Sequence, residues 1–238
     1  MIGIIKKILR FKEVFLPTKK NLGGYGANTY IEFPVYISYP KAVFMEADTR
    51  LRGGSKILCS EHSSVTIKKY TVIGMNCMII TNKHVSTVGI PQILLGISGI
   101  NDVNNNIVIE EDVWVGANVT VMGSVNLGRG CICGACSLVT KTVPPYAIVV
   151  GSPAKIVGVK FSIDQIIEHE KVLYPEEQRF SREYLESLFE QYYSNLKSFG
   201  VVTNFTPEHI ERLKLCARLR KFTDKSYFEK LNRLKRDV

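Results

Sequence analysis

The chain has 238 residues, of which 45% are hydrophobic and 22% charged, a composition typical of a folded globular protein and not of a disordered chain. Its net charge of +9 comes from its two ends, and no helix-turn-helix, zinc-finger or RNA-recognition motif accompanies that charge, so we expect no nucleic-acid partner. The six cysteines form no evenly spread disulfide framework and neither a signal peptide nor a membrane-spanning apolar run is recognisable, which predicts free thiols and a cytoplasmic protein.

The first predicted element is an amphipathic helix at the amino terminus. Lys6, Lys7, Arg10 and Lys12 surround an apolar stripe of Ile2, Ile5, Leu9 and Phe15, with Ile4, Ile8 and Leu16 alongside. We favour a helix that caps the open end of the following domain, and the alternative is peripheral contact with an anionic membrane. Residues 1–55 together form an N-terminal segment that includes the first irregular coils.

A six-residue period organises the middle of the chain. Its first position is aliphatic or small, at Ile67, Ile73, Ile79, Val115, Val121, Leu127, Cys133 and Val139. Its fifth position is small or β-branched, at Thr71, Cys77, Val119, Val125, Cys131 and Ser137. The period fits short strands around a three-walled prism, so that 18 residues make one coil and Cys59 lies one coil from Cys77. Glycines follow the inward residue where the backbone turns closely or takes a positive φ, at Gly74, Gly116, Gly128 and Gly134.

The period breaks once, because 30 residues separate Ile79 from Ile109. We interpret this spacing as one further coil plus about a dozen residues that leave the prism after His84. The inserted loop, near residues 85–106, reads VSTVGIPQILLGISGINDVN and is too apolar to extend freely into water. We expect it to pack on the prism or on a neighbouring subunit.

After Gly158 the period ends and helical patterns begin, forming a C-terminal extension over residues 159–238. Residues 162–171 predict a short helix, Pro175 interrupts, and residues 181–197 carry an apolar stripe at helical spacing. Thr206 and Pro207 predict the start of a helix that runs to about Arg220, with another from about Lys225. The sequence indicates no role for this extension.

Residues 107–158, IVIEEDVWVGANVTVMGSVNLGRGCICGACSLVTKTVPPYAIVVGSPAKIVG, resemble the C-terminal coils of the hexapeptide-repeat acyltransferases, in particular their sugar and polysaccharide O-acetyltransferase branch. The elements VWVGAN and VTKTVPP are the most specific, and the resemblance extends over residues 56–158. It implies a mainly β protein, a left-handed parallel β-helix of hexapeptide repeats with a C-terminal helical appendage. It also implies acetyl-CoA as the donor, a homotrimer and a role in polysaccharide biosynthesis.

The expected reaction moves an acetyl group from acetyl-CoA directly to a hydroxyl of a sugar or glycan precursor, which requires a general base. His84 stands where the repeat opens into the insertion, at the corner that holds the family's catalytic histidine, and His62 is the fallback base. Asn82 matches a polar position in the family's acceptor site, which we expect the insertion to shape. No carboxylate is assigned as the partner of His84, and a backbone carbonyl could orient the ring.

The resemblance also implies a donor site. Trp114, the single tryptophan, would lie beside the pantetheine arm of CoA, and a place in a subunit interface is its structural alternative. The backbones of Gly116 and Ala135 would line the donor groove. Near the nucleotide end, the family positions are matched by Thr140, Lys141 and Lys155.

No metal is expected. Cys131, Cys133 and Cys136 lack a second pair at zinc-finger spacing, and two of them fill repeat positions that favour small apolar groups. Carbonic anhydrases of this fold need three histidines at one site, whereas the coils contain only His62 and His84. Two further functions remain open: N-acetylation of an amino sugar, and a non-catalytic β-helix scaffold.

Overall fold

A computed structural model of the chain describes residues 2–234, and its centre is a coil of short parallel strands that form three walls. Wall A consists of β1 (Gly24–Tyr25), β4 (Val43–Met45), β7 (Val65–Ile67) and β12 (Ile107–Ile109). Wall B consists of β2 (Tyr30–Ile31), β5 (Arg50–Leu51), β8 (Val72–Ile73), β13 (Trp114–Val115), β15 (Ile132–Cys133), β17 (Ala147–Gly151) and the antiparallel β18 (Ala154–Val159). Wall C consists of β3 (Tyr36–Ile37), β6 (Lys56–Leu58), β9 (Met78–Ile80), β14 (Thr120–Val121) and β16 (Leu138–Val139).

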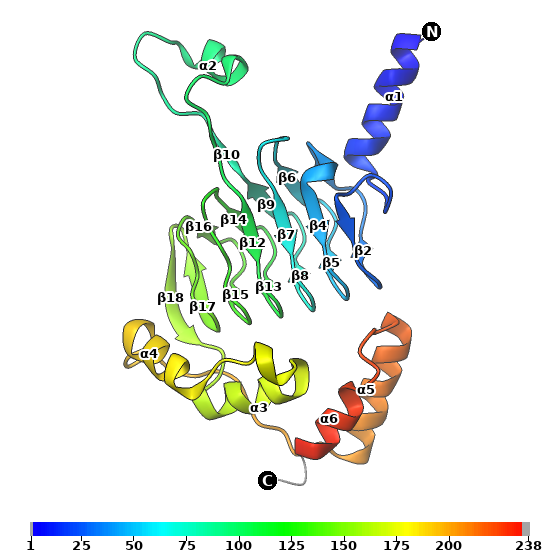
Figure 1. Cartoon of the computed structure of the whole chain (residues 1–238), viewed down its shortest axis with the longest axis vertical. Helices are drawn as coiled ribbons and strands as arrows, with labels where there is room; N and C mark the ends of the chain where they lie inside the picture. The colour runs from blue at the N-terminus through cyan, green and yellow to red at the C-terminus, as the bar shows by residue number, and fades with distance from the viewer. Residues whose placement is uncertain (1, 235–238) are drawn as a thin grey trace.

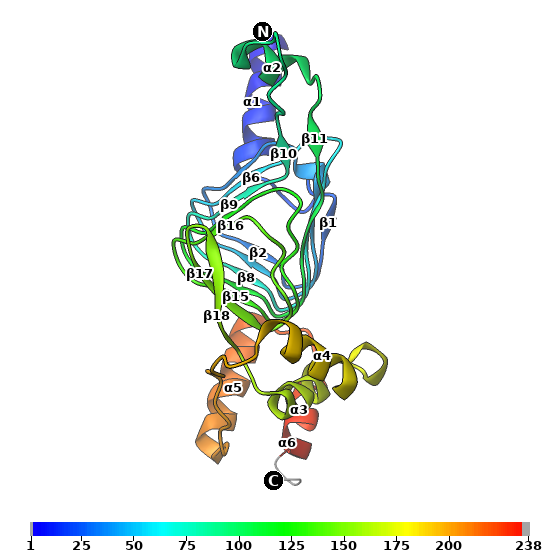
Figure 2. The ribbon, with the colours of Figure 1, turned by 90° about the vertical axis from the view of Figure 1, so that its left-hand side faces the viewer.

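The chain turns from wall A to wall B at corner 1, from B to C at corner 2, and from C back to A at corner 3. Figure 2 shows the resulting three-sided outline. Inward side chains stack in register, so that Ile73, Val115 and Cys133 of wall B form one ladder and are each at most 1% exposed. Burial of an aliphatic side chain of this size contributes about 1.5–3 kcal/mol. The hexapeptide period therefore specifies a parallel β-helix, as the sequence predicts.

All variation in coil length occurs at corner 3. Equivalent residues in walls A, B and C, such as Phe44, Arg50 and Lys56, are six apart in every coil. From wall C to the next wall A, the paired registers give 8, 10, 30, 6 and 4 residues in successive coils. The prediction of a single break is wrong, because the first two coils are also longer than three hexads.

The register also corrects the size of the insertion. Thr66 pairs with Val108, 42 residues on, whereas Trp114 pairs with Ile132, 18 residues on. The insertion thus removes 24 residues from the prism rather than a dozen, because the chain re-enters at the next wall without completing another coil. For the same reason Cys59 and Cys77 do not lie one coil apart.

The predicted glycines allow close stacking and not a positive φ. A Cβ added at Gly74 would lie 2.6 Å from the carbonyl carbon of Gly116, and one added at Gly116 would lie 2.7 Å from the amide nitrogen of Ala135. The left-handed conformation falls on other corner residues, and at corner 1 it is adopted by Asn28, Asp48, Tyr70, Asp112, Gly130 and Tyr146. Asn and Asp tolerate this conformation best among residues with a side chain.

The C-terminal helices run along corner 1 (Figures 1 and 2). They are α3 (Ile163–Leu173), α4 (Arg182–Tyr192), α5 (Pro207–Arg220) and α6 (Tyr227–Leu234), with short 3-10 turns at Pro40–Ala42 and Glu176–Gln178. Ser162, Ser181 and Thr206 cap α3, α4 and α5 through their hydroxyl groups. The helices coincide with the predicted segments, except that α4 ends at Tyr192, before residue 197. The link from α5 to α6 returns to the first coils, where the Thr223 hydroxyl donates to Asp48.

A buried charge network joins α3 to corner 1. Glu170 is 1% exposed and accepts hydrogen bonds from Arg129 Nη1 at 3.2 Å and from the Tyr146 hydroxyl at 2.9 Å. The Arg129 guanidinium also bonds Glu111 and lies over the ring of Tyr174 at 4.4 Å. Because both charges are taken out of water, each depends on the other for compensation.

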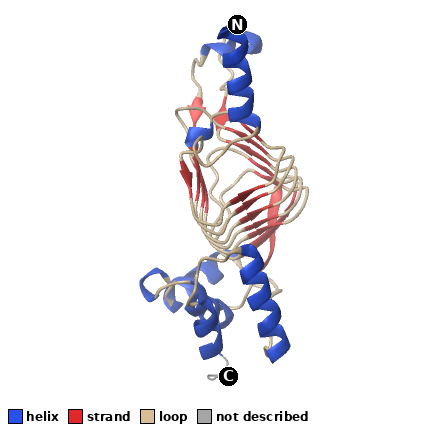
Figure 3. Ribbon diagram, turned by 90° about the vertical axis from the view of Figure 1, so that its right-hand side faces the viewer, coloured by secondary structure: helices blue, strands red, loops and turns tan. Residues whose placement is uncertain are grey.

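Two helices project from corner 3, on the side of the coil opposite the C-terminal helices (Figures 2 and 3). Only the last turn of α1 (Ile2–Phe15) contacts the coil, where Val14 is buried and the Phe15 ring packs on Tyr36 with centroids 5.1 Å apart. Leu9 and Phe11 are exposed, so α1 does not cap the coil's open end and the favoured interpretation is wrong. The side chains of Ile2, Ile4, Ile5, Lys6 and Ile8 lie outside the described residues.

The insertion carries the second projecting helix, α2 (Gln92–Ser98). Leu95 is its buried side chain, whereas Ile93, Leu94 and Ile97 are exposed. Figure 1 shows α2 standing away from the walls, so the expectation that the insertion packs on its own prism is wrong. Cover by a neighbouring subunit stays a prediction. Within residues 2–234 no helix combines the length and apolar character needed to cross a membrane.

Candidate active site

The insertion leaves and re-enters corner 3 as a two-stranded antiparallel ribbon. In this ribbon β10 (Asn82–Lys83) pairs with β11 (Val103–Asn104), so that Asn82 faces Asn104 and Lys83 faces Val103. The next facing pair is His84 and Asp102, and His84 Nδ1 lies 2.9 Å from Asp102 Oδ1. Cross-strand neighbours of an antiparallel pair lie within side-chain reach, so the register itself brings the imidazole and the carboxylate together.

The contact determines which ring nitrogen is available for chemistry. A carboxylate can only accept a hydrogen bond, so Nδ1 donates its proton to Asp102 and Nε2 carries the lone pair. The His84 side chain is 49% exposed and that of Asp102 is 19% exposed. The pair therefore presents an oriented, accessible base at the surface of corner 3.

Hydrogen bonds to the previous coil anchor the base of the ribbon. Asn82 Oδ1 accepts from the hydroxyls of Ser63 at 3.1 Å and Thr81 at 2.5 Å, and Thr81 is fully buried. The Ser60 hydroxyl donates to Asn104 Oδ1 at 3.1 Å. Asn82 thus lies two residues from His84, with its carbonyl oxygen engaged in the fold and its Nδ2 available to a ligand.

Asp102 is the site residue that the sequence does not reveal. It lies 18 residues from His84, and only the antiparallel return of the insertion places it there. The turn before it is tied back by Asn101 Nδ2, which donates to Thr87 Oγ1 at 3.0 Å. Positive φ angles at Gly99 and Asn101 shape this turn. Recognition of the hairpin, with its asparagine-rich return, is the signal that could have identified Asp102.

The predicted donor-site residues fall at the two edges of wall C. Trp114 is 56% exposed and points outward from wall B, and Gly116 and Ala135 follow at corner 2. Thr140 and Lys141 are exposed at corner 3, after β16, which is the edge that also holds Asn82 and His84. Lys155 is exposed on β18, opposite Val150. One chain therefore does not bring all the predicted residues into one cleft.

The remaining histidines and the cysteines have other environments. His62 is also at corner 3, one coil before His84, and its Nε2 lies 3.6 Å from Glu61. Cys131 and Cys133 are buried in the core and Cys136 is exposed at corner 2. Burial raises the pKa of the Cys131 thiol well above its usual value, which keeps it protonated and suits packing. Among residues 2–234 no cluster of three or more His, Cys, Asp and Glu side chains could hold a metal ion.

No family model matches the chain. Among curated proteins, a chloramphenicol acetyltransferase from Klebsiella aerogenes is 48% identical over 61 residues, which is 26% of this chain and 29% of that protein. A probable macrolide acetyltransferase from Lysinibacillus sphaericus is 49% identical over 25% of this chain and 33% of its own length. The matches thus span about a third or less of these relatives. The galactoside O-acetyltransferase of Escherichia coli K12 is 27% identical over 58% of this chain and 64% of its own.

Solved structures include two acetyltransferases of similar fold. A hexapeptide-repeat acetyltransferase from Vibrio cholerae, in complex with acetyl-CoA, is 25% identical with a TM-score of 0.55 and covers 60% of this chain and 74% of its own. A galactoside acetyltransferase in complex with CoA has a TM-score of 0.51 at 22% identity and covers 68% of this chain and 74% of its own, which is a likeness of fold alone. Both comparisons confirm the resemblance that the repeats indicate.

Proposed function

We propose that this chain, whose repeats and fold are those of the hexapeptide-repeat acetyltransferases, transfers an acetyl group from acetyl-CoA to a hydroxyl of a sugar or glycan precursor. The observation that carries the proposal is the His84–Asp102 pair at the mouth of the insertion. A base held in one tautomer at an exposed corner is what transfer to a hydroxyl requires. A scaffold without catalysis would have no use for it.

In the proposed reaction His84 Nε2 removes the proton of the acceptor hydroxyl while its oxygen attacks the thioester carbonyl. The carbon–sulfur bond then breaks, the acetyl ester forms, and the CoA sulfur leaves and takes up a proton. Asp102 stabilises the imidazolium that exists between the two proton transfers. Asn82 Nδ2 is positioned to donate a hydrogen bond to the acceptor.

The predicted donor residues fit a phosphorylated thioester. Within the described part of the chain, neither Lys141 nor Lys155 has a carboxylate within ion-pairing distance, so both ammonium groups are available to phosphates. Trp114 offers an exposed ring face to the pantetheine arm. The stacked backbones of Gly116 and Ala135 leave the surface of corner 2 low enough for an extended donor to lie on it.

A homotrimer would unite the two halves of the site. Since Trp114 and Gly116 lie at one edge of wall C and His84 at the other, a threefold assembly would set the donor half of one chain beside the base of the next. We also propose that the coil is left-handed and that residues 56–158 carry the acetyltransferase site between the N-terminal segment and the extension. Analytical ultracentrifugation tests the assembly, and an active monomer would refute the shared site.

Contact with a membrane is proposed for the projecting helices. Leu9 and Phe11 of α1 and the aliphatic residues of α2 are exposed on one side of the molecule, and Lys7, Arg10 and Lys12 of α1 are exposed beside them. Such a surface suits anionic lipid, where a precursor of polysaccharide biosynthesis would be linked. Cosedimentation with phosphatidylserine vesicles at low salt is expected, and it should be lost at high salt. Protein that stays in the supernatant at low salt would refute the contact.

The catalytic proposal is tested by incubating the purified protein with acetyl-CoA and a panel of sugars, with release of free thiol as the readout. Thiol release that depends on a neutral sugar and on His84 is expected. Amino sugars in the same panel distinguish O- from N-acetylation. A protein that releases no thiol with any acceptor, although it binds CoA, would favour the scaffold.

A further inference from the structure

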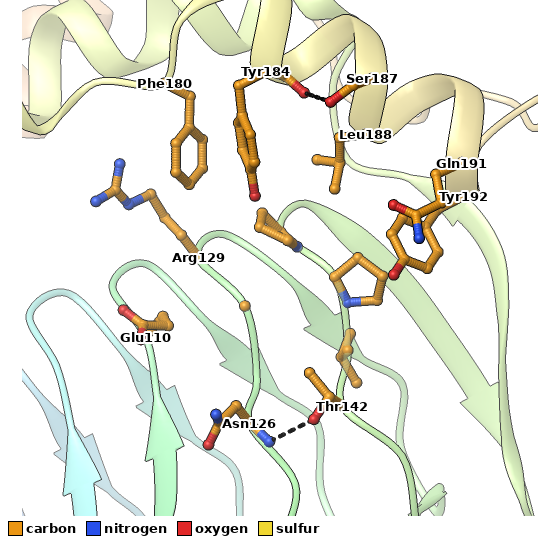
Figure 4. A pocket seen from close by; sticks show the side chains of 14 residues that line it. Glu110, Asn126, Arg129, Thr142, Phe180, Tyr184, Ser187, Leu188, Gln191 and Tyr192 are labelled. Carbon is orange, nitrogen blue, oxygen red and sulfur yellow. Dashed lines mark hydrogen bonds between the residues drawn. The ribbon is translucent and has the colours of Figure 1, made fainter.

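A cavity of about 550 Å³ lies between α4 and wall A of the last two coils. Figure 4 shows Tyr184, Gln191 and Tyr192 entering it from α4, with Asn126 and Thr142 on the opposite side. None of the residues of the candidate active site lines it. Its volume is within the range usual for small-ligand sites.

Two tyrosines give the cavity exposed aromatic surface. Tyr184 and Tyr192 are 42% and 40% exposed, although they belong to the apolar stripe that the helical pattern would bury. The Phe180 ring supports Tyr184 from behind, with centroids 4.8 Å apart. In Figure 4 the Tyr184 hydroxyl points toward the wall across the cavity. These rings are held in place but remain open on one side.

The charged groups in the lining are already neutralised. Arg129 is paired with Glu111 and Glu170, and Glu110 accepts a hydrogen bond from Lys68 at 2.6 Å. A phosphate or carboxylate ligand would therefore gain no free cation, and a cationic ligand would gain no free carboxylate. The cavity favours an uncharged ligand.

Several polar groups in the lining are unused in the described part of the chain. Asn126 Oδ1 accepts from Val108 N, which leaves Nδ2 as a free donor. The Thr142 oxygen accepts from Asn126 N, so its hydroxyl hydrogen is free to donate. Within residues 2–234 the Gln191 amide has no hydrogen-bond partner. The lining thus combines aromatic faces with separate neutral donors and acceptors.

We propose that this cavity is a second carbohydrate site, which binds one uncharged sugar ring. A pyranose has an apolar face of C–H groups that can pack on Tyr184 or Tyr192 and a rim of hydroxyls that can reach Asn126, Thr142 and Gln191. Binding here involves no acetyl transfer, so the inference goes beyond the proposed function. An acceptor longer than one sugar would contact the protein at a place remote from His84.

The test is saturation-transfer NMR on the full-length protein with glucose, galactose, mannose, N-acetylglucosamine and galacturonate. At least one neutral sugar is expected to bind, galacturonate more weakly. Loss of a stacking ring should weaken that sugar by about tenfold in Tyr184→Ala. The matched control is Tyr39→Ala, an equally exposed tyrosine outside the cavity, which should leave the affinity unchanged.

A second variant, Gln191→Leu, guards against misfolding of Tyr184→Ala, because Gln191 is exposed and its replacement preserves the helix. It should weaken the same sugar with an unchanged unfolding temperature. The proposal is overturned if no neutral sugar binds, or if neither cavity variant alters the affinity. A sugar that binds only at the His84 site would give the second outcome, and a cavity covered by another subunit would give the first.

Discussion

Corner 1 and corner 3 of the same coil differ in how the chain uses them. Corner 1 has the same length in every coil, and its left-handed residues contact the C-terminal helices through buried charges. Corner 3 changes length in nearly every coil and carries the exposed His84–Asp102 pair. The comparison indicates that regular corners support stability, whereas the variable corner supports chemistry.

The largest effect is expected at corner 3. Replacement of the base in His84→Ala should lower kcat by about 10²–10⁴-fold and leave CoA affinity nearly unchanged, because only proton transfer is lost. Steady-state kinetics and CoA titration measure the two quantities. His62→Ala is the matched control, and it should retain activity. Turnover within threefold of wild type in His84→Ala would transfer the role of base to His62.

At corner 1 the expected loss is in stability and not in chemistry. Arg129→Ala leaves Glu170 buried without its cation, which should reduce the free energy of unfolding by about 3–5 kcal/mol. Arg182→Ala is the control, since its ion pair with Asp164 is exposed and should contribute little. Urea unfolding measures both. Equal stability of the two variants would show that the network at corner 1 does not stabilise the fold.

Asp102→Asn separates orientation from proton transfer. The amide can donate to Nδ1 and stabilise the wrong tautomer, so kcat should fall by about 10- to 100-fold, less than in His84→Ala. The effect on the double variant with His84→Ala should be negligible, because Asp102 acts through the imidazole. Additive losses would mean that Asp102 contacts a substrate instead.

The smallest effect concerns pH and Asp112. Burial raises the pKa of this carboxyl, but hydrogen bonds and charge from His169 and Lys160 outweigh burial and hold it below its usual value. In the folded protein Asp112 stays ionised at a pH where the unfolded chain takes up a proton. Its stabilising contribution is therefore present above about pH 4 and is lost as the pH falls further. Asp112→Asn should show a smaller loss between pH 6 and 3 in urea unfolding, and an unchanged loss would contradict this origin.

The periodic part of the molecule was predictable from sequence because each inward residue reports its own position. Val115, Val121 and Leu127 recur at six residues and are all buried. The helix starts at Ser162, Ser181 and Thr206 were also visible, because a capping hydroxyl acts within three residues of itself.

Features that depend on residues distant in sequence were not predictable. The period gives no information on where a long loop re-enters, so the insertion was undercounted. Asp102 meets His84 only through the ribbon's register, and Glu170 meets Arg129 only after α3 docks. The projecting direction of α1 and α2 likewise has no local signal, since an apolar stripe indicates burial without naming the surface that provides it.

The confinement of length changes to corner 3 has a consequence for how such a protein can diversify. The 24 inserted residues begin and end beside Thr81 and Asn105, whose backbones remain hydrogen-bonded to one another, so the insertion is a closed cassette. A different cassette could be exchanged at this point while the ladders on either side keep their pairing. Selection for a new acceptor could then act on one loop, without rebuilding the coil that carries it.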